Sequence, residues 1–451
     1  MAPNEFEMET QTPASETPNL ISRQGSDIHL ESNSQWHEGI EHESSLPPVD
    51  GGKDAWLFLS AAFLLEVLVW GFPYAYGIFQ DYYSTNAPFA GSRNIAIIGT
   101  CAMGLMYLSA PLVFGTLQRY PRTKRPAIMI GLLIMCLSLG LSSLSQTVTH
   151  LIITQGVFYA IGGAMAYSPA IQFMDEWFVA KKGFAFGVMW AGTGIGGVVI
   201  PLLLQWLLNN YGFRTTLRAW AIILFVSTAP VTLYLKPRLP ISASTSGRRI
   251  SFTFLRDRVF LLLQLGNVLE GLGYFLPSIY LPTFASQLGA NSTIAALTLI
   301  LFNVASVFGN LLMGTIIDRF HVTAGILFST VGSTLSVFLI WGFANSLPPL
   351  FVFAFMYGFF AGCYSATWPG VMKAVQTSTG RMDGTMVFAA LAAGRGIGNV
   401  VSGPVSEALV RFGTVGHKGV YGTEYGPLVL FTGISAVLGG AGILGKRIGW
   451  M

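Results

Sequence analysis

Long apolar segments alternate with short polar ones along most of this chain. The apolar segments lie at 55–79, 94–117, 127–146, 151–173, 183–208, 219–235, 259–285, 294–317, 322–344, 348–372, 385–409 and 427–445. Each approaches the roughly 20 residues that a helix needs to cross a bilayer, and a helix satisfies its own backbone hydrogen bonds inside lipid. A β-barrel would show shorter segments of alternating polarity instead. The pattern therefore predicts an all-α membrane protein with 12 transmembrane helices.

The composition strengthens this prediction. Of the 451 residues, 52% are hydrophobic and only 10% are charged, whereas soluble domains carry about 25% charged residues. The sequence contains no P-loop and no soluble catalytic domain, so an enzyme or an ATP-driven pump is disfavoured. The three cysteines, Cys101, Cys136 and Cys363, lie in apolar segments without the spacing of metal ligands. We therefore predict no metal site and no cofactor.

The basic residues are distributed unevenly among the segments that connect the predicted helices. Seventeen of the 25 Lys and Arg residues lie in one set of alternate segments, and five lie in the opposite set. The richer set comprises 117–126, 174–182, 236–258, 318–321, 373–384 and the residues after 445. Cytoplasmic loops carry the Lys and Arg excess, so we expect both termini to be cytoplasmic and infer no nucleic-acid partner. The sequon at Asn291 lies in the opposite set, where we predict glycosylation.

Residues 1–50 differ in character from the rest of the chain. They contain ten acidic residues, a single basic residue, Arg23, and no apolar period. Such a composition cannot bury enough apolar surface to fold, so it predicts a disordered cytoplasmic tail. The acidic start also lacks the apolar segment of a signal peptide.

Matching residues recur about 200 positions apart. Glu66, Pro73 and Tyr76 return as Glu270, Pro277 and Tyr280, each at an offset of 204. The repeat predicts two pseudo-symmetric six-helix halves, 51–235 and 259–445, joined by a basic cytoplasmic linker, 236–258, and followed by a cytoplasmic tail, 446–451. Parallel six-helix halves with a substrate site near the midplane are the arrangement of major facilitator transporters.

A glycine-rich motif is also duplicated, with one charged difference. Ala191–Val199 and Ala393–Val401 share their pattern at an offset of 202, but Arg395 stands where the first copy has Thr193. Small residues let membrane helices approach closely, so we expect both copies to lie at helix contacts. The first copy matches the glycine pattern of dinucleotide-binding loops, but the preceding strand that such a site requires is absent.

The stretch Gly314–Arg319 resembles the loop signature of major facilitator transporters. The resemblance implies a cytoplasmic gate, in which Asp318 and Arg319 contact a charge or a helix end across the two halves. The corresponding first-half stretch, Gly115–Arg119, has no acidic residue. An ordinary helix end with solvated charges is the alternative.

The first half resembles the monocarboxylate porter family, and in particular its fungal members. The resemblance rests on Asp50–Gly52 with Trp56 before the first helix and on Glu176–Phe178 with Lys181–Gly183, which lead to Gly187 and the glycine motif. The stretch Tyr211–Arg214, followed by Leu217 and Arg218, is similar to the loop after that helix in fungal members. The resemblance implies a transporter of the fungal branch of this family, whose substrates are diverse. The lysine and the Asp/Arg pair of animal lactate carriers have no counterpart in the corresponding helices, so the lactate-type proton relay is not implied.

Three ionisable residues fall near the middle of predicted helices, namely Glu66, Glu270 and Arg395. Charged groups at this depth normally face the protein interior and serve function. An arginine can hold a carboxylate through two parallel hydrogen bonds, so we predict that Arg395 binds or balances an organic anion. We assign Glu66 and Glu270 to proton coupling; permanently neutral carboxyls and a structural salt bridge are the alternatives.

Further polar and aromatic residues lie on the same predicted helices. We predict that the substrate site also includes Asn267, Asn399, Tyr76 and Tyr280. The sequence thus predicts a secondary active transporter of a small, monocarboxylate-like organic anion, coupled to protons and working by alternating access. An efflux pump for a fungal secondary metabolite is the alternative, and a transporter-like nutrient receptor is a weaker one. We expect the plasma membrane, with the vacuolar membrane as the alternative.

Overall fold

The structure is a computed structural model that describes residues 46–92, 94–240, 252–380, 384–415 and 419–443. Most of the predicted tail 1–50, much of the predicted linker 236–258 and the whole of the tail 446–451 lie outside the described residues. The described residues are almost entirely helical and include no β-strand.

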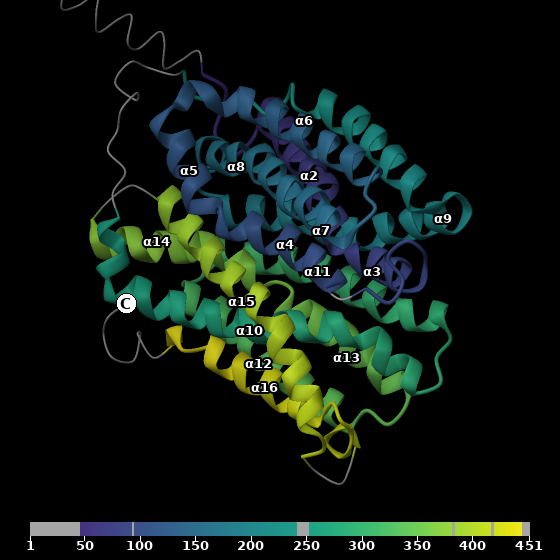
Figure 1. Cartoon of the computed structure of the whole chain (residues 1–451). Helices are drawn as coiled ribbons and strands as arrows, with labels where there is room; N and C mark the ends of the chain where they lie inside the picture. Colours follow the sequence, from purple (N-terminus) through teal and green to yellow (C-terminus); the bar gives the residue numbers. More distant parts are fainter. Residues whose placement is uncertain (1–45, 93, 241–251, 381–383, 416–418, 444–451) are drawn as a thin grey trace, which may run out of the picture. The chain divides into compact units, whose positions relative to one another are not determined.

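The α-helices follow one another along the chain (Figure 1). In the first half they are α2 (Gly52–Tyr74), α3 (Tyr76–Thr85), α4 (Ile95–Leu108), α5 (Ala110–Arg119), α6 (Lys124–Ser142), α7 (Val148–Leu151), α8 (Tyr159–Trp177) and α9 (Lys182–Val231). In the second half they are α10 (Arg258–Gln287), α11 (Ser292–Arg319), α12 (Val322–Leu335), α13 (Leu347–Ala361), α14 (Trp368–Thr379), α15 (Gly384–Phe412) and α16 (Gly426–Gly439).

Shorter pieces link some of these helices. A π-helical stretch, Ile152–Phe158, joins α7 to α8, and another, Ser336–Ile340, extends α12 before the turn Trp341–Phe343. Single 3₁₀ turns lie at Pro121–Thr123, Thr253–Arg256, Tyr364–Thr367 and Gly419–Gly422.

The helices confirm the predicted membrane spans. Ten helical stretches among the described residues are long and apolar enough to cross a bilayer. One of them, the 50-residue α9, is two helices divided at Gly212, whose φ of 69° suits glycine and interrupts the helix. The shorter apolar helix α16 follows at the end of the described chain. Together these account for the twelve segments that the hydropathy pattern predicts.

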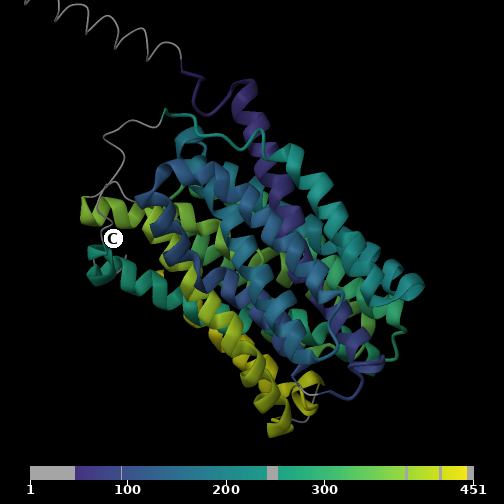
Figure 2. The same cartoon turned by 45° about the horizontal axis from the view of Figure 1, so that its top comes forward.

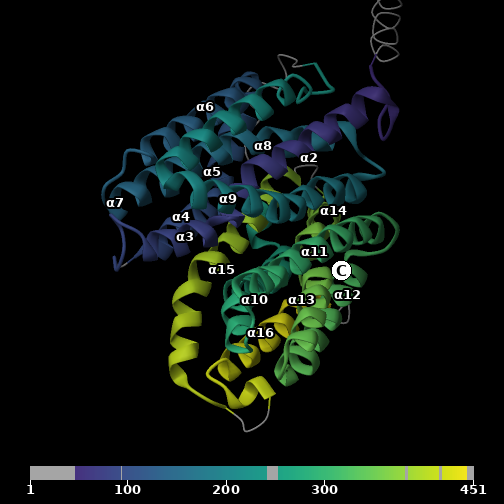
Figure 3. The same ribbon diagram turned by 90° about the vertical axis from the view of Figure 1, so that its right-hand side faces the viewer.

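The spans form two groups of six, in agreement with the predicted halves. Figure 3 shows α2–α9 on one side and α10–α16 on the other, and the long helices of both groups lie side by side in Figure 2. We call these groups the first half and the second half.

Glycines of α9 and α15 allow close helix contacts. On α9, a Cβ at Gly192 would lie 2.6 Å from the Phe63 carbonyl oxygen of α2, and one at Gly194 would lie 2.7 Å from Val307 of α11. One face of α9 therefore packs within its own half, and another packs across to the second half.

The copy on α15 repeats this arrangement. A Cβ at Gly398 would lie 2.6 Å from the carbonyl carbon of Gly271 on α10, and one at Gly396 would lie 2.8 Å from Tyr107 on α4, in the first half. Both copies of the motif thus lie at close helix contacts, as their sequence predicts.

The Gly398 contact can be tested with a single methyl group. Gly398→Ala should lower the free energy of unfolding by about 1–3 kcal/mol, because the methyl group would overlap the α10 backbone. Gly140→Ala on α6 is the matched control, since a Cβ there would have no atom within 4 Å, and alanine favours the helix by up to about 1 kcal/mol. Thermal unfolding of the purified protein measures both. Equal midpoints for the two variants would contradict the packing account.

Candidate functional site

A cavity of about 40 Å³ lies between the two halves. The first half contributes Glu66, Trp70 and Tyr74 from α2, Tyr107 from α4, Tyr167 and Ile171 from α8, and Trp190, Thr193 and Gly194 from α9. The second half contributes Tyr274, Asn303, Ser306, Asn310, Gly362, Ser365, Trp368, Phe388 and Arg395. Both halves therefore share one cavity, and eight of its 18 lining residues are aromatic.

Part of the cavity wall is a cluster of aromatic rings that joins the halves. Phe388 stacks on Trp190 at 6.0 Å between ring centroids, and Trp368 packs edge-on against both at 5.2 and 5.6 Å. The cluster continues beyond the cavity to Phe186 and Phe114, which lie 5.7 Å from Phe388. The rings of α5 and α9 belong to the first half and those of α14 and α15 to the second. The contacts between these rings can therefore break only when the halves move apart.

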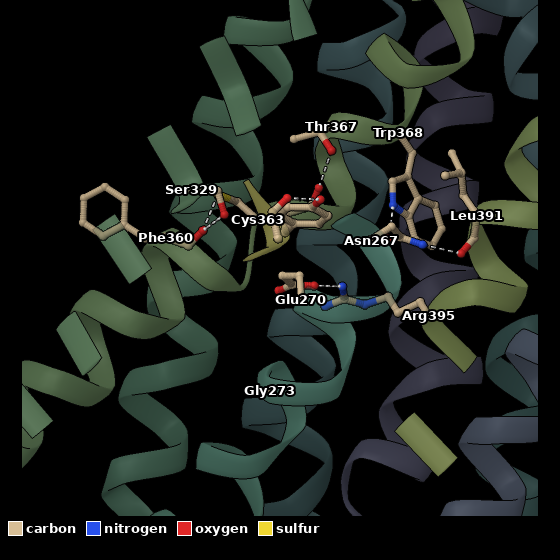
Figure 4. A network of polar contacts seen from close by, with 12 residues as sticks. Asn267, Glu270, Gly273, Ser329, Phe360, Cys363, Thr367, Trp368, Leu391 and Arg395 are labelled. Atoms are coloured by element: carbon tan, nitrogen blue, oxygen red, sulfur yellow. Dashed lines mark hydrogen bonds and ion pairs between the residues drawn. The ribbon is translucent and has the colours of Figure 1, made fainter. Parts of the chain in front are cut away.

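Arg395 lines the cavity in an ion pair with Glu270 (Figure 4). Its Nη1 donates to Glu270 Oε2 at 2.5 Å, and the two residues are only 1% and 6% exposed. The guanidinium carbon also lies 4.2 Å from the centroid of the Tyr274 ring, a cation–π contact. The charge of Arg395 is therefore balanced from within the second half.

Glu66 lines the same cavity but has a different environment. It is 3% exposed, and no hydrogen bond or ion pair joins its carboxyl to any described residue. Burying an ionised carboxylate without a partner costs several kcal/mol. Glu66 is thus an acidic residue of the cavity lining that no described residue neutralises.

Asn267 lies behind the cavity wall and not in its lining. Its Oδ1 accepts from Trp368 Nε1 at 3.1 Å, and its Nδ2 donates to the Leu391 carbonyl oxygen at 2.8 Å (Figure 4). Asn267 therefore fixes the orientation of Trp368, a residue that does line the cavity.

The structure places three other predicted substrate residues outside the cavity lining. The Tyr76 hydroxyl donates to the Ile95 carbonyl oxygen at 2.5 Å, and the Tyr280 hydroxyl donates to Ser406 Oγ at 3.2 Å. Asn399 Nδ2 lies 3.4 Å from Met103 Sδ. The side chains of Tyr76, Tyr280 and Asn399 thus contact neighbouring helices in this structure. They do not line the cavity with Glu66 and Arg395.

Several lining residues were not predicted from the sequence, among them Trp70, Tyr107 and Tyr274. A signal was present for two of them, since Trp70 and Tyr274 each follow a duplicated glutamate by four residues. Residues four apart share one face of a helix. Tyr107 offered no such signal, because its position depends on the contact between α4 and α15.

Asp318 lies at the contact between α11 and the first turn of α9. Its carboxylate accepts from the amides of Gly183 and Phe184 at 2.6 and 2.7 Å. An anion is favoured at a helix N-terminus because free amides and the helix dipole both point toward it. Arg319 is exposed. Asp318 therefore joins the halves as the gate prediction requires, although its role in gating stays a prediction.

Asp50 holds the segment just before α9. Its carboxylate accepts from the amides of Val179, Ala180 and Lys181 at 2.9, 3.0 and 2.9 Å. Burial raises the pKa of this carboxyl, but the three amides and the Lys181 charge outweigh burial and bring the pKa below its ordinary value of 3.8. Asp50 thus shapes the helix end that Asp318 contacts.

Asn291 is exposed at the start of α11. Its Oδ1 accepts from the Ile294 amide at 2.8 Å and caps the helix. Exposure leaves the predicted glycosylation open, and it stays a prediction.

The family model of the Major Facilitator Superfamily matches residues 57–289 and 263–447. The chain belongs to this superfamily. Proteins with this fold are transporters, so the expectation that the chain is not an enzyme is confirmed. A crystal structure of the superfamily transporter FucP in the outward conformation shares the fold, with a TM-score of 0.62 and 16% identity over 85% of this chain and 97% of FucP.

Curated relatives span nearly the whole chain. "MFS transporter asaE" of Aspergillus flavus is 27% identical over 91% of this chain and 90% of its own length. "Agnestins efflux protein AgnL12" of Paecilomyces divaricatus is 27% identical over 90% of each chain, and "Fujikurins efflux protein" of Gibberella fujikuroi is 27% identical over 89% and 84%. The narrower resemblance to monocarboxylate porters stays a prediction, since these relatives are named as transporters and efflux proteins.

The buried ion pair makes a strong prediction about stability. Glu270→Gln should lower the free energy of unfolding by about 3–5 kcal/mol, because Arg395 would be left buried without a counter-charge. The double variant Glu270→Gln with Arg395→Gln should lose less, since no charge remains buried. Glu407→Gln is the control: it breaks an exposed pair with Arg411 and should cost about 1 kcal/mol or less. Thermal unfolding tests this order, and a single variant as stable as the control would refute it.

The Asp318 contact predicts a local change in amide exchange. Asp318→Asn should speed hydrogen–deuterium exchange at Gly183 and Phe184 by at least about tenfold, because a neutral amide accepts these hydrogen bonds less strongly than a carboxylate. Asp54→Asn is the matched control, since Asp54 is half exposed and lies 3.5 Å from Lys236. Unchanged exchange in the Asp318 variant would mean that the contact does not hold the halves together in solution.

Proposed function

We propose that this protein is a secondary active transporter that exports a small organic molecule with an aromatic or otherwise apolar body. The main support is the shared cavity, to which both halves contribute large aromatic rings. Sites for organic ligands are typically lined by hydrophobic and aromatic side chains together with polar groups that orient the ligand. Here eight of the 18 lining residues are aromatic and seven are polar or charged. Two relatives are named as efflux proteins, which supports export as the direction.

The ion pair weighs against a simple organic-anion site. A carboxylate substrate would have to compete with Glu270 for Arg395, whose charge is already balanced at 2.5 Å. Transport of an organic anion is the second candidate, because Arg395 still reaches the cavity lining. Such transport requires the ion pair between Glu270 and Arg395 to break during the transport cycle.

The size of the cavity implies that transport involves a conformational change. About 40 Å³ holds only a few water molecules, whereas sites for drug-sized ligands measure roughly 300–1,000 Å³. Substrate entry therefore requires the halves to separate, as alternating access provides. The contacts that must break on one side are the Asp318 contact with α9 and the aromatic cluster around Phe388.

Protons are the proposed driving ion, with Glu66 and Glu270 as the candidate carriers. Glu66 has no partner among the described residues, so proton binding removes the cost of its buried charge. Glu270 can release Arg395 when it is protonated. The proposed location is the plasma membrane, where export to the medium takes place.

Metabolite profiling of a deletion strain tests the direction and the site together. Without the transporter, at least one aromatic small molecule should accumulate in the cells and become depleted in the medium, and the wild-type gene should restore the parental pattern. Trp190→Ala should restore export about tenfold less well, since it removes a cavity wall. Trp206→Ala is the matched control, because Trp206 is 55% exposed on the same helix. If the deletion strain instead contains less of the molecule inside its cells than the parent, the protein takes the molecule up, which would contradict the proposal.

A further inference from the structure

The two duplicated glutamates have different partners, although their surroundings repeat. Glu66 on α2 and Glu270 on α10 occupy matching positions of the two halves. Each is followed four residues later by a large aromatic residue, Trp70 or Tyr274, on the same helix face. Each half therefore contains a buried carboxyl beside an aromatic ring.

In the second half, this arrangement is completed by a cation from the protein. The Arg395 guanidinium binds the Glu270 carboxylate and lies against the face of the Tyr274 ring, with its central carbon 4.2 Å from the ring centroid. Both contacts favour a positive charge at this point.

In the first half, the described residues that line the cavity include no cation. Thr193 stands at the position that matches Arg395, and its hydroxyl donates to the Trp190 carbonyl oxygen of its own helix at 2.5 Å. The Glu66 carboxyl has no hydrogen-bond or ion-pair partner among the described residues. Glu66, Trp70 and Thr193 all line the cavity, so the place left by the absent guanidinium belongs to the substrate site.

We propose that the substrate supplies this missing cation, so that a protonated amine of the transported molecule binds between Glu66 and Trp70. The inference rests on the proposed transport function and names the chemical class of the substrate: an apolar or aromatic molecule with a basic nitrogen. Of the described lining residues, Arg395 is the sole cation, and Glu270 already neutralises it. Nothing else described in the cavity competes with the substrate for Glu66, apart from a proton.

The aromatic walls suit such a group. The centroid of the Trp70 ring lies 5.4 Å from that of Tyr167 and 4.6 Å from that of Tyr107, and all three rings line the cavity together with Glu66. Rings attract cations through their quadrupole, most strongly where water is excluded. An anionic group placed here would instead meet the Glu66 carboxyl and the ring faces, both of which repel it.

Binding of three matched probes to the purified protein in nanodiscs tests the inference. Tryptamine, indolepropionamide and indolepropionate share one ring and a two-carbon chain, but end in a cationic, a neutral and an anionic group. We expect tryptamine to bind at least about tenfold more tightly than the amide, because a charge-assisted contact and a cation–π contact are gained. Glu66→Gln should remove this preference and leave binding of the amide within about twofold.

Two further variants separate a binding role from a folding role. Thr193→Arg copies the arrangement of the second half, so its guanidinium should occupy the subsite and also abolish the tryptamine preference. Glu407→Gln makes the same chemical change on an exposed carboxyl and should leave the preference unchanged. If Glu66→Gln keeps the preference, or if wild type prefers indolepropionate or binds all three equally, the inference is wrong.

This outcome is independent of the transport assay. Selective tryptamine binding together with no change in metabolite distribution on gene deletion would overturn the proposed export and keep the subsite. Altered metabolite distribution with no tryptamine preference would overturn the subsite and keep the export function.

Discussion

The buried pair of Glu270 and Arg395 is the interaction on which the rest of the site depends. An arginine near the bilayer centre costs roughly 2.5–3.5 kcal/mol on insertion scales, and this protein offsets that cost with a carboxylate at 2.5 Å and an aromatic ring at 4.2 Å. Both partners lie on α10, so α15 must approach α10 closely. Gly398 permits this approach, because any larger residue would meet the backbone at Gly271.

The same pair gives the cavity its polarity. With Arg395 neutralised in the second half, the first-half carboxyl of Glu66 is the remaining acidic group of the described lining without a partner. Two halves that repeat in fold therefore differ in charge. The residues at the matching positions Thr193 and Arg395 account for this difference, because the carboxyl of the second half is paired with an arginine and that of the first half is not.

The hydropathy pattern alone predicted the twelve spans, and the repeat of Glu66 at Glu270 predicted the halves, because both depend on local composition and on spacing along the chain. The duplicated glycines were predicted as close contacts for the same reason. The pairing of Arg395 with Glu270 was left as one alternative, since the partner of a buried charge depends on how α10 and α15 pack. Tyr76 and Tyr280, which match each other in the repeat, were assigned to the site because they lie on the same predicted helices as Glu66 and Glu270, but their hydroxyls contact Ile95 and Ser406 instead. A repeat shows that two residues are equivalent and does not show which way they face.

Among the described residues that line the cavity, the first half thus contributes no cation to pair with Glu66, whereas Arg395 pairs with Glu270 in the second half. The proposed substrate provides the cation for Glu66. The most direct measurement is a cryo-electron microscopy map of the protein in nanodiscs with bound tryptamine. We predict density for the ammonium between the Glu66 carboxyl and the Trp70 ring, with the Glu270–Arg395 pair intact. Density against Arg395, with Glu270 turned away from it, would contradict this central claim.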